Sequence, residues 1–307
     1  MLLMALAMLM SLAACGGSNS GSAANDTDAA AEALAAAQAA LPELPDFTGM
    51  DTSAIPGVED GILTVGMECD YAPYNWTQTD DSYGAVPIAN NPGNYANGYD
   101  VLMAKRICEA YGWELEVMAI GWDGLVPALN AGTLDAIIAG QSMTAERLEQ
   151  VDMAGPYIYA SIVCVTKVDA DQASATGLSD LTGTCTAQTG TVWYDTCLPQ
   201  IPGAEIMPEA ETATAMIMAV ESGTVDFICT DMPTALGATS TYNDLMILNF
   251  TGTDDDFDVS DEEVFIGISV LKGNSELQNA INGVLANMSS DDFNTLLAGA
   301  IAIQPEI

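Results

Sequence analysis

Short apolar runs begin to alternate with polar and glycine-containing stretches at Ile62. Some of these runs are continuous or alternate in the manner of strands, and the segments between them have the spacing of amphipathic helices. Strands that alternate with helices predict an α/β fold with a mainly parallel sheet. The predicted strands cover residues 62–65, 114–120 and 134–139, and the predicted helices cover residues 100–111 and 124–131.

The first predicted helix carries a signal at each end. Asp100 is expected to cap its start, because an aspartate side chain can accept a hydrogen bond from a free backbone N–H of the first turn. Gly112 is expected to end it in a left-handed conformation. Before this helix, residues 77–97 are largely polar and are expected to form a loop.

One segment occurs twice in the chain. Residues 128–140 align without gaps on residues 219–231, and five of the thirteen positions are identical. Each copy has the pattern of a helix, a glycine that ends it and a buried strand. The repeat indicates two similar α/β lobes, although a unit of this general kind can also recur by chance. The strand ends, where open α/β sheets bind ligands, are then residues 140–142 in one copy and Asp231 in the other.

The first residues have the pattern of an export signal. Residues 1–12 are apolar, too short to span a bilayer as a mature helix, and lead into Ala13-Ala14-Cys15. This ending resembles the bacterial lipobox, which implies a lipoprotein signal peptide over residues 1–15 and lipidation of Cys15. A plain signal peptide with a chance cysteine is the alternative, and the usual basic residues before the apolar stretch are absent. Residues 16–57 are of low complexity and are expected to form a flexible tether.

The composition excludes several classes of function. The chain has 5 Lys and Arg residues against 43 Asp and Glu residues, for a formal net charge of −38. So few cations cannot form the basic surface that nucleic acid or an anionic membrane requires. The chain has no histidine, which excludes imidazole metal sites and histidine-based catalytic triads.

The cysteines give no sign of a metal site. None of the six that follow Cys15 has the Cys-x-x-Cys spacing of a zinc or iron–sulfur site, so no metal and no cofactor is expected. Disulfide pairing cannot be deduced from the sequence of an exported protein. Several of these cysteines lie in apolar patterns and can be small buried hydrophobic residues: they are Cys69, Cys108, Cys164, Cys185, Cys197 and Cys229.

Because cations are so few, the position of Arg147 carries weight. It follows a predicted buried strand and a glycine-containing turn, at the start of a helix, in the segment DAIIAGQSMTAER of residues 135–147. An arginine there can present two parallel N–H donors to a carboxylate, beside backbone N–H groups of the turn. A surface arginine that pairs with a neighbouring acid is the alternative.

The order of these segments resembles the bacterial extracytoplasmic solute-binding proteins of family 3, the polar amino acid receptors of ABC importers. The resemblance runs from about Ile62 to the end of the chain, and its motifs are specific in combination. The similar segments are VGMECDYAPY (residues 65–74), GYDV (98–101), WDGLVPAL (122–129), the segment 135–147 and QTGT (188–191).

The resemblance implies a two-lobed α/β architecture, the periplasmic-binding-protein type 2 fold. Two crossover hinge strands would join the lobes, which close on the ligand. The crossovers are expected near residues 160–161 and 264–265. Lobe 1 would then comprise residues 58–160 and 265–307, and lobe 2 would comprise residues 161–264.

The family also implies roles for individual residues around the ligand's α-carboxylate. Arg147 would bind this carboxylate through two hydrogen bonds, with help from the backbone N–H of Ser142. Thr191, at the start of the helix after the second-lobe turn, would donate its hydroxyl or N–H to the same group.

Five further residues would surround the rest of the ligand. Asp231 would pair with the α-ammonium, and the carbonyl of Gly140 would accept a hydrogen bond from it. Tyr71 and Trp122 would stack on the ligand side chain, and Glu68 would lie near its far end. The alternatives are core aromatic residues for Tyr71 and Trp122, a helix N-cap for Asp231 and a solvated acid for Glu68.

Together these features predict a lipid-anchored receptor that captures a free amino acid as a monomer and delivers it to an ABC permease. The acidic Glu68 and the negative net charge rank arginine or another cationic amino acid first. Glutamine, cystine or another neutral polar amino acid ranks second, and acidic ones rank last. An enzyme that resembles the cyclohexadienyl dehydratases of this fold family is the alternative, with Glu68 or Asp231 as its acid–base residue.

Overall fold

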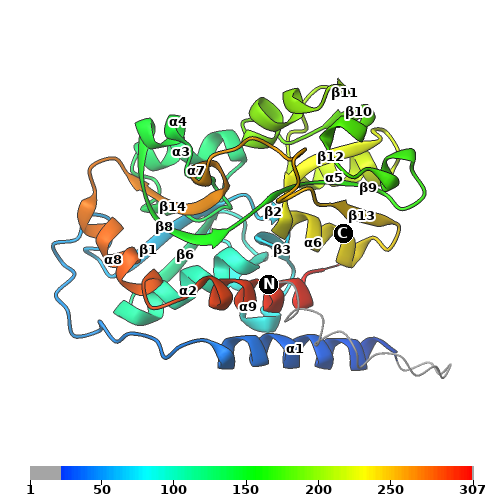
Figure 1. Cartoon of the computed structure of the whole chain (residues 1–307). Coiled ribbons are helices and arrows are strands. Elements are labelled where there is room, and N and C mark those ends of the chain that lie inside the picture. The colour runs from blue at the N-terminus through cyan, green and yellow to red at the C-terminus, as the bar shows by residue number, and fades with distance from the viewer. Residues whose placement is uncertain (1–21, 306–307) are drawn as a thin grey trace.

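The computed structural model describes residues 22–305, which form two lobes that each contain a five-stranded sheet (Figure 1). The sheet of lobe 1 has the strand order β6-β1-β7-β14-β8, and that of lobe 2 has the order β11-β10-β12-β9-β13. In both sheets the first three strands pair in parallel and the last two pairings are antiparallel. The predicted α/β architecture is therefore present in two similar copies, but each sheet is mixed and not mainly parallel as predicted.

Among the strands, β1, β6, β7 and β12 lie in apolar runs that the sequence analysis singled out. In lobe 1 the strands are β1 (Ile62–Met67), β6 (Glu114–Ala119), β7 (Ala136–Ile137), β8 (Val151–Tyr159) and β14 (Phe265–Leu271). In lobe 2 they are β9 (Ile162–Lys167), β10 (Thr182–Thr186), β11 (Gly203–Ile206), β12 (Phe227–Asp231) and β13 (Leu245–Leu248).

Two segments cross between the lobes and lie side by side. One joins β8 to β9, and the other leads from lobe 2 into β14 (Figure 1). The backbone N–H of Ala160 in the first crossover donates a hydrogen bond to the carbonyl of Val264 in the second, at 3.0 Å. Any rotation of one lobe against the other has to pass through this paired connection.

The helices cover the sheets with apolar faces. In α8, for example, Leu277, Ile281 and Val284 are buried at helical spacing. The α-helices of lobe 1 are α2 (Tyr99–Tyr111), α3 (Trp122–Asn130), α4 (Ala145–Gln150), α8 (Ser275–Leu285) and α9 (Ser290–Ile303), and those that follow the first crossover are α5 (Ala213–Glu221), α6 (Met232–Thr241) and α7 (Asp261–Val264). Single turns are η2 (Ser82–Gly84), η3 (Asp171–Ser174), η4 (Leu178–Asp180), η5 (Trp193–Cys197) and η6 (Leu198–Gln200).

The repeated segment has the same internal hydrogen bonds in both lobes. A carboxylate oxygen of Asp135 accepts from the backbone N–H of Thr64 in β1 at 2.8 Å, and a carboxylate oxygen of Asp226 accepts from that of Thr184 in β10 at 2.7 Å. In each copy the glycine that ends the preceding helix has a positive φ, +71° and +72°. These matched bonds join the third strand of each sheet to its neighbour. The repeat is thus a structural unit as well as a sequence pattern.

Two local predictions before α2 were wrong. Asp100 does not cap this helix: Gly98 occupies the N-cap position, and Asp100 is fully buried in the first turn. The predicted polar loop contains much of a small antiparallel sheet of order β2-β3-β5-β4, whose strands are too short for their polar residues to show a period. These strands are β2 (Asp70–Tyr71), β3 (Asn75–Gln78), β4 (Val86–Pro87) and β5 (Tyr95–Asn97).

The N-terminal segment also differs from the predicted free tether. Residues Ser22–Ala40 form α1, which lies along α9 at the base of the molecule (Figure 1). Leu34 is buried in this contact, and Ala37 lies where α9 has Gly299, whose missing side chain lets the two helices approach closely. Residues 41–61 then continue along lobe 1, where Phe47 stacks on Tyr111 with ring centroids 4.9 Å apart. The predicted signal peptide with Cys15 lies outside the described residues.

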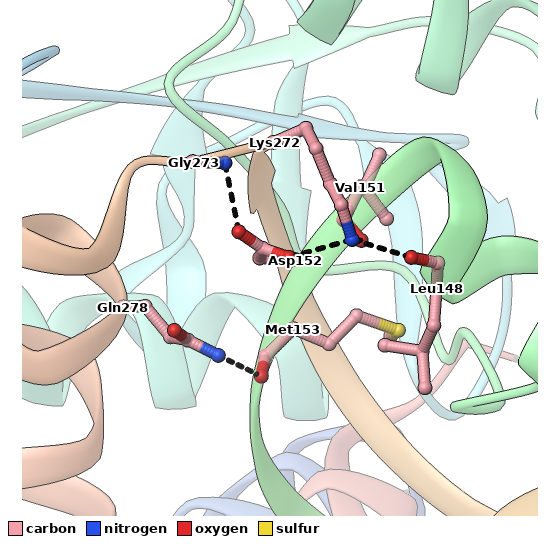
Figure 2. A network of polar contacts seen from close by, with 7 residues as sticks. All are labelled: Leu148, Val151, Asp152, Met153, Lys272, Gly273 and Gln278. Atoms are coloured by element: carbon pink, nitrogen blue, oxygen red, sulfur yellow. Dashed lines mark hydrogen bonds and ion pairs between the residues drawn. The ribbon is translucent and has the colours of Figure 1, made fainter.

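Lys272 links the end of α4 to β8 through a hydrogen bond and an ion pair (Figure 2). Its ammonium group donates to the carbonyl of Leu148 at 2.6 Å and pairs with the Asp152 carboxylate at 2.8 Å. The other oxygen of Asp152 accepts from the backbone N–H of Gly273 at 2.7 Å. The short helix that carries Arg147 is thereby held against the sheet of lobe 1.

Within residues 22–305, no helix combines the length and the apolar character needed to cross a lipid bilayer.

Candidate functional site

A cavity of about 680 Å³ lies between the two lobes. Its wall in lobe 1 is formed by the start of α3 and by the turn and helix of residues 140–150. Its wall in lobe 2 is formed by residues 188–196, which follow β10, and residues 260–263 form part of its rim. The cavity therefore lies beyond the carboxyl ends of β7 and β10, where an open α/β sheet is expected to bind ligands.

The structure brings six of the eight predicted ligand-binding residues to the wall of this cavity. Glu68 and Asp231 are not among the lining residues: Glu68 contacts the lining residue Gln188, and Asp231 is hydrogen-bonded to Tyr74. The six that line the cavity are Tyr71, Trp122, Gly140, Ser142, Arg147 and Thr191.

Arg147 points into the site without an acidic partner. It is the third residue of α4, whose N-cap Thr144 accepts a hydrogen bond from the Arg147 backbone N–H at 3.2 Å. The guanidinium donates through Nη1 to the Ser142 carbonyl, and its central carbon lies 5.5 Å from the centroid of the Trp122 ring. Burial lowers the pKa of Arg147 to about 10, so the group stays charged at neutral pH. The ion pairs found among residues 22–305 involve Lys167 and Lys272 and leave Arg147 without one.

The acidic residues around the cavity make Arg147 stand out further. Of the described residues that line the cavity, Arg147 is the only basic one. Five lining residues are acidic, and most of them are exposed at the rim: Asp123, Glu146, Asp195, Glu262 and Glu263.

Gly140 has to be a glycine because of its aromatic neighbour. Its φ is +63°, in the left-handed region, and a Cβ atom at this position would lie 2.7 Å from the Tyr71 ring. Tyr71 is 1% exposed, and its hydroxyl accepts a hydrogen bond from Thr234 of lobe 2 at 3.2 Å. Tyr71 thus belongs to the core between the lobes, which was the alternative considered for it, and it also lines the cavity.

Thr191 is already partly engaged in lobe 2. Its hydroxyl donates to the carbonyl of Gln188 at 2.7 Å, so the hydroxyl proton is already used within lobe 2. Gln188 itself lines the cavity and is 1% exposed. Its Oε1 atom is buried and has no hydrogen-bond partner among the described residues. Sequence reasoning used Gln188 only as part of a motif, and a buried amide with a free acceptor could not be foreseen from that motif.

Glu68, which directly follows β1 in lobe 1, contacts Gln188 of lobe 2. The amide nitrogen of Gln188 is 3.4 and 3.5 Å from the two carboxylate oxygens of Glu68. Burial raises the pKa of Glu68 to about 7, and the Gln188 contact opposes this only partly. Neighbouring carboxylates, among them Asp70 and Asp100, push the pKa in the same direction as burial. Glu68 is therefore a carboxylate that gains strongly from any positive charge placed near it.

Asp231 performs the capping role that was considered for it. One oxygen accepts from the backbone N–H of Thr234 at 2.9 Å, at the start of α6, and the other accepts from the Tyr74 hydroxyl at 2.8 Å. The residue is 1% exposed, and burial raises the pKa of its carboxyl group. Tyr74 belongs to lobe 1, so this hydrogen bond also joins the lobes deep in the cleft.

The described residues contain no group of three or more His, Cys, Asp or Glu side chains arranged to hold a metal ion. The six cysteines from Cys69 to Cys229 are buried as free thiols. The cavity itself is lined by one guanidinium, backbone groups, aromatic rings and a buried amide.

Comparison with known proteins agrees with this geometry. The sequence profile of the bacterial extracellular solute-binding proteins, family 3, matches residues 63–298. The L-cystine-binding protein TcyJ of Escherichia coli (strain K12) is 24% identical over 234 residues, which are 76% of this chain and 79% of that protein. The ABC transporter arginine-binding protein 1 of the same strain is 26% identical over 233 residues, 75% of this chain and 86% of that protein.

A solved structure has the same fold. The crystal structure of an amino acid ABC transporter substrate-binding protein from Streptococcus pneumoniae, bound to L-arginine, superposes with a TM-score of 0.67 at 24% identity. The superposed region covers 83% of this chain and 99% of the Streptococcus pneumoniae protein in that crystal structure. The chain therefore belongs to the bacterial extracellular solute-binding proteins of family 3 and has the type 2 periplasmic-binding-protein fold.

Proposed function

We propose that this protein is the amino acid receptor of an ABC importer, and that it captures a polar, cationic amino acid between its lobes and delivers it to the permease. The observation that carries the proposal is Arg147, a half-buried guanidinium without an acidic partner among the described residues, at the wall of an interlobe cavity. A ligand carboxylate supplies the partner that this group lacks. The backbone N–H groups near Ser142 and Thr191 add donors for the same carboxylate.

Three features favour a ligand side chain that donates hydrogen bonds and carries positive charge. Once Arg147 is paired with the ligand carboxylate, the remaining charges on the cavity wall are acidic. The free Oε1 atom of Gln188 needs a donor, which a guanidinium, ammonium or amide provides and a carboxylate does not. Behind it, Glu68 would be stabilised in its ionised form by a nearby cation. Arginine therefore ranks first, glutamine or cystine second, and glutamate last.

Capture follows from differential affinity for two arrangements of the lobes. Arg147 in lobe 1 and Thr191 in lobe 2 line the same cavity, so a ligand that contacts both would bridge the lobes and favour the closed cleft. Binding therefore shifts the population toward the closed form, which the permease would recognise. No chemical step on the ligand is required of the receptor, which acts as a monomer in this scheme.

The experiment that tests this function is a ligand panel on the purified protein. Arginine, lysine, histidine, glutamine, cystine and glutamate are compared by thermal shift and then by calorimetry. A ligand at 100 times its dissociation constant adds about 2.7 kcal/mol to the free energy of unfolding, and we expect the largest shift with arginine. Tight binding of glutamate would contradict the ranking. Formation of phenylpyruvate from prephenate would support the dehydratase-like alternative.

The same panel should be run on two matched arginine variants. Arg147→Ala should lower arginine affinity by about 30-fold to several thousand-fold, because the ligand carboxylate loses its partner in a desolvated site. Arg106→Ala is the control, since Arg106 is partly buried in lobe 1 and donates to the Pro42 carbonyl, away from the cavity. Equal affinities of the two variants would reject Arg147 as the carboxylate anchor.

We further propose that Cys15 carries a lipid anchor. The proposal rests on the lipobox-like sequence Leu12-Ala13-Ala14-Cys15. The Cys15→Ser variant should not incorporate a fatty acid label in a bacterial host, and it should leave the membrane fraction for the soluble one. Continued labelling of this variant would place the anchor elsewhere.

A further inference from the structure

A carboxylate buried beneath the cavity connects two of the turns that form the ligand site. Asp100 is 0% exposed, and no basic side chain contacts it among the described residues. One of its oxygens accepts from the hydroxyl of Tyr157 at 2.6 Å, and the other accepts from the side-chain amide of Asn75 at 2.7 Å. Both oxygens are thus used as acceptors within lobe 1.

Each of these two partner side chains also accepts a hydrogen bond from a backbone N–H in a turn of the ligand site. The Tyr157 hydroxyl accepts from the N–H of Gly140 at 3.0 Å, and the Asn75 side-chain oxygen accepts from the N–H of Cys69 at 2.7 Å. Gly140 lines the cavity, and Cys69 directly follows Glu68.

The backbone at both ends of this network has an uncommon conformation. Gly140 has a φ of +63°, and Cys69, which is not a glycine, has a φ of +58°. A non-glycine residue in this region is disfavoured and persists where the surroundings hold it. Two hydrogen-bonded chains start at Asp100, one through Tyr157 to Gly140 and one through Asn75 to Cys69, and we call them the two arms. They supply such restraint at the two turns that carry Gly140 and Glu68.

We propose that Asp100 is a positioning residue of the ligand site, which acts through Tyr157 on Gly140 and through Asn75 on Cys69. Neither Asp100 nor Asn75 nor Tyr157 lines the cavity, so none of them touches the ligand. They fix the position of the Gly140 backbone and of the turn that carries Glu68. The consequence for ligand affinity rests on the proposed function, whereas the restraint on the two turns does not.

The chemistry of the arms requires two acceptor oxygens on residue 100. A tyrosine hydroxyl has one proton, which Tyr157 gives to Asp100 while its oxygen accepts from Gly140. The Asn75 amide likewise directs its N–H to Asp100 and its oxygen to Cys69. An asparagine at position 100 has a single acceptor oxygen, so one arm loses its acceptor whichever way the amide faces.

Amide exchange in the ligand-free protein tests the restraint without any assumption about the ligand. Tyr157→Phe removes the acceptor for the Gly140 N–H, and we expect exchange at Gly140 to become about tenfold faster. Tyr99→Phe is the matched control: Tyr99 is equally buried, stacks on Tyr157, and donates its hydroxyl to the Tyr157 carbonyl rather than to a site turn. Exchange at Gly140 that is the same in the two variants would overturn the proposal.

Arginine titration then tests the consequence for binding. With L-arginine as the probe, Tyr157→Phe and Asp100→Asn should each bind about tenfold more weakly than the wild type, and Tyr99→Phe should bind nearly as well as it. If exchange changes at Gly140 while arginine affinity does not, the turns are restrained but do not determine binding, and the positioning role is rejected. If the wild-type protein does not bind arginine, the proposed ligand fails, and the exchange experiment still decides the restraint.

Discussion

At the scale of single residues, the cavity combines charges that are poorly solvated and not yet neutralised. Arg147 keeps its proton with a pKa of about 10, and Glu68, which contacts Gln188 of lobe 2, has a pKa of about 7 because burial disfavours its ionised form. Such groups gain more from a charged partner than exposed ones do. A free amino acid, which brings one carboxylate and one ammonium group, suits a site of this kind. The charge of its side chain decides how far the ionised form of Glu68 is stabilised.

The pH dependence of arginine binding should report on Glu68. A guanidinium near this carboxylate stabilises the ionised form, so binding lowers its pKa and releases a proton below about pH 7. Arginine affinity should therefore rise about tenfold from pH 6 to pH 8, more steeply than glutamine affinity. Glu68→Gln should remove the difference between the two ligands in calorimetric titrations. Identical slopes for arginine and glutamine in the wild type would show that Glu68 does not sense the ligand side chain.

The same carboxylate affects the stability of the ligand-free protein. Because the folded-state pKa of Glu68 lies above its unfolded value of 4.5, the folded protein holds this proton more tightly. The contribution of Glu68 to the free energy of unfolding is therefore most favourable below pH 4.5 and is lost as the pH rises through 7.

At the scale of elements, the regular apolar patterns predicted three strands and two helices of lobe 1, although the predicted 134–139 strand is reduced to β7 (Ala136–Ile137). The 114–120 strand and the 124–131 helix differ from β6 and α3 by only a residue or two at their ends. These elements could be predicted because each buries one face, and the backbone geometry of a helix or strand sets the spacing of the buried side chains along the sequence. Gly132 and Gly223, three residues before Asp135 and Asp226, also ended their helices as expected.

The features that the sequence did not predict depend on partners far along the chain. Asp100 looked like a cap because its acceptors could serve the nearest backbone, yet they bind Asn75 and Tyr157 instead. Asp231 is both a cap and a link between lobes, and only the second role needed Tyr74. A free side-chain acceptor such as that of Gln188 appears only when all neighbouring groups are placed.

Helix α1 shows the same limit, because its partner α9 lies at the other end of the chain. Leu34→Ala should weaken this contact by about 2 kcal/mol, since the small residues around it cannot fill the space. Amide exchange over residues 29–40 should then accelerate, while arginine affinity stays the same. Gln38→Ala, at an exposed position of the same helix, is the control and should leave exchange nearly unchanged. Full protection in Leu34→Ala would mean that α1 does not rely on α9.

At the scale of the whole molecule, the lobes are joined by more than the two crossovers. Hydrogen bonds between Tyr74 and Asp231 and between Thr234 and Tyr71 lie deep in the cleft. The side chain of Gln304, just after α9, donates to the Gly237 carbonyl of lobe 2 at 2.8 Å. The net charge of −38 surrounds this arrangement with a strongly negative potential.

This potential should govern how fast a cationic ligand arrives. Raising the salt concentration from 20 to 200 mM shortens the screening length from about 20 Å to below 10 Å. The association rate constant of arginine should fall about fivefold over this range, and that of glutamine should stay constant. Stopped-flow measurements of both ligands provide the comparison. A fall of equal size for glutamine would assign the salt effect to lobe closure instead of steering.

The paired aspartates of the repeat have a consequence for how such receptors diversify. Asp135 and Asp226 secure each lobe from within, through bonds to Thr64 and Thr184 that include no residue of the cavity wall. Residues at the strand ends, such as Gln188, take no part in these two bonds, so their replacement leaves the bonds in place. Natural selection can then retune the preferred nutrient in small steps, and an ancestor with one preference can found a lineage with another while the framework is inherited unchanged.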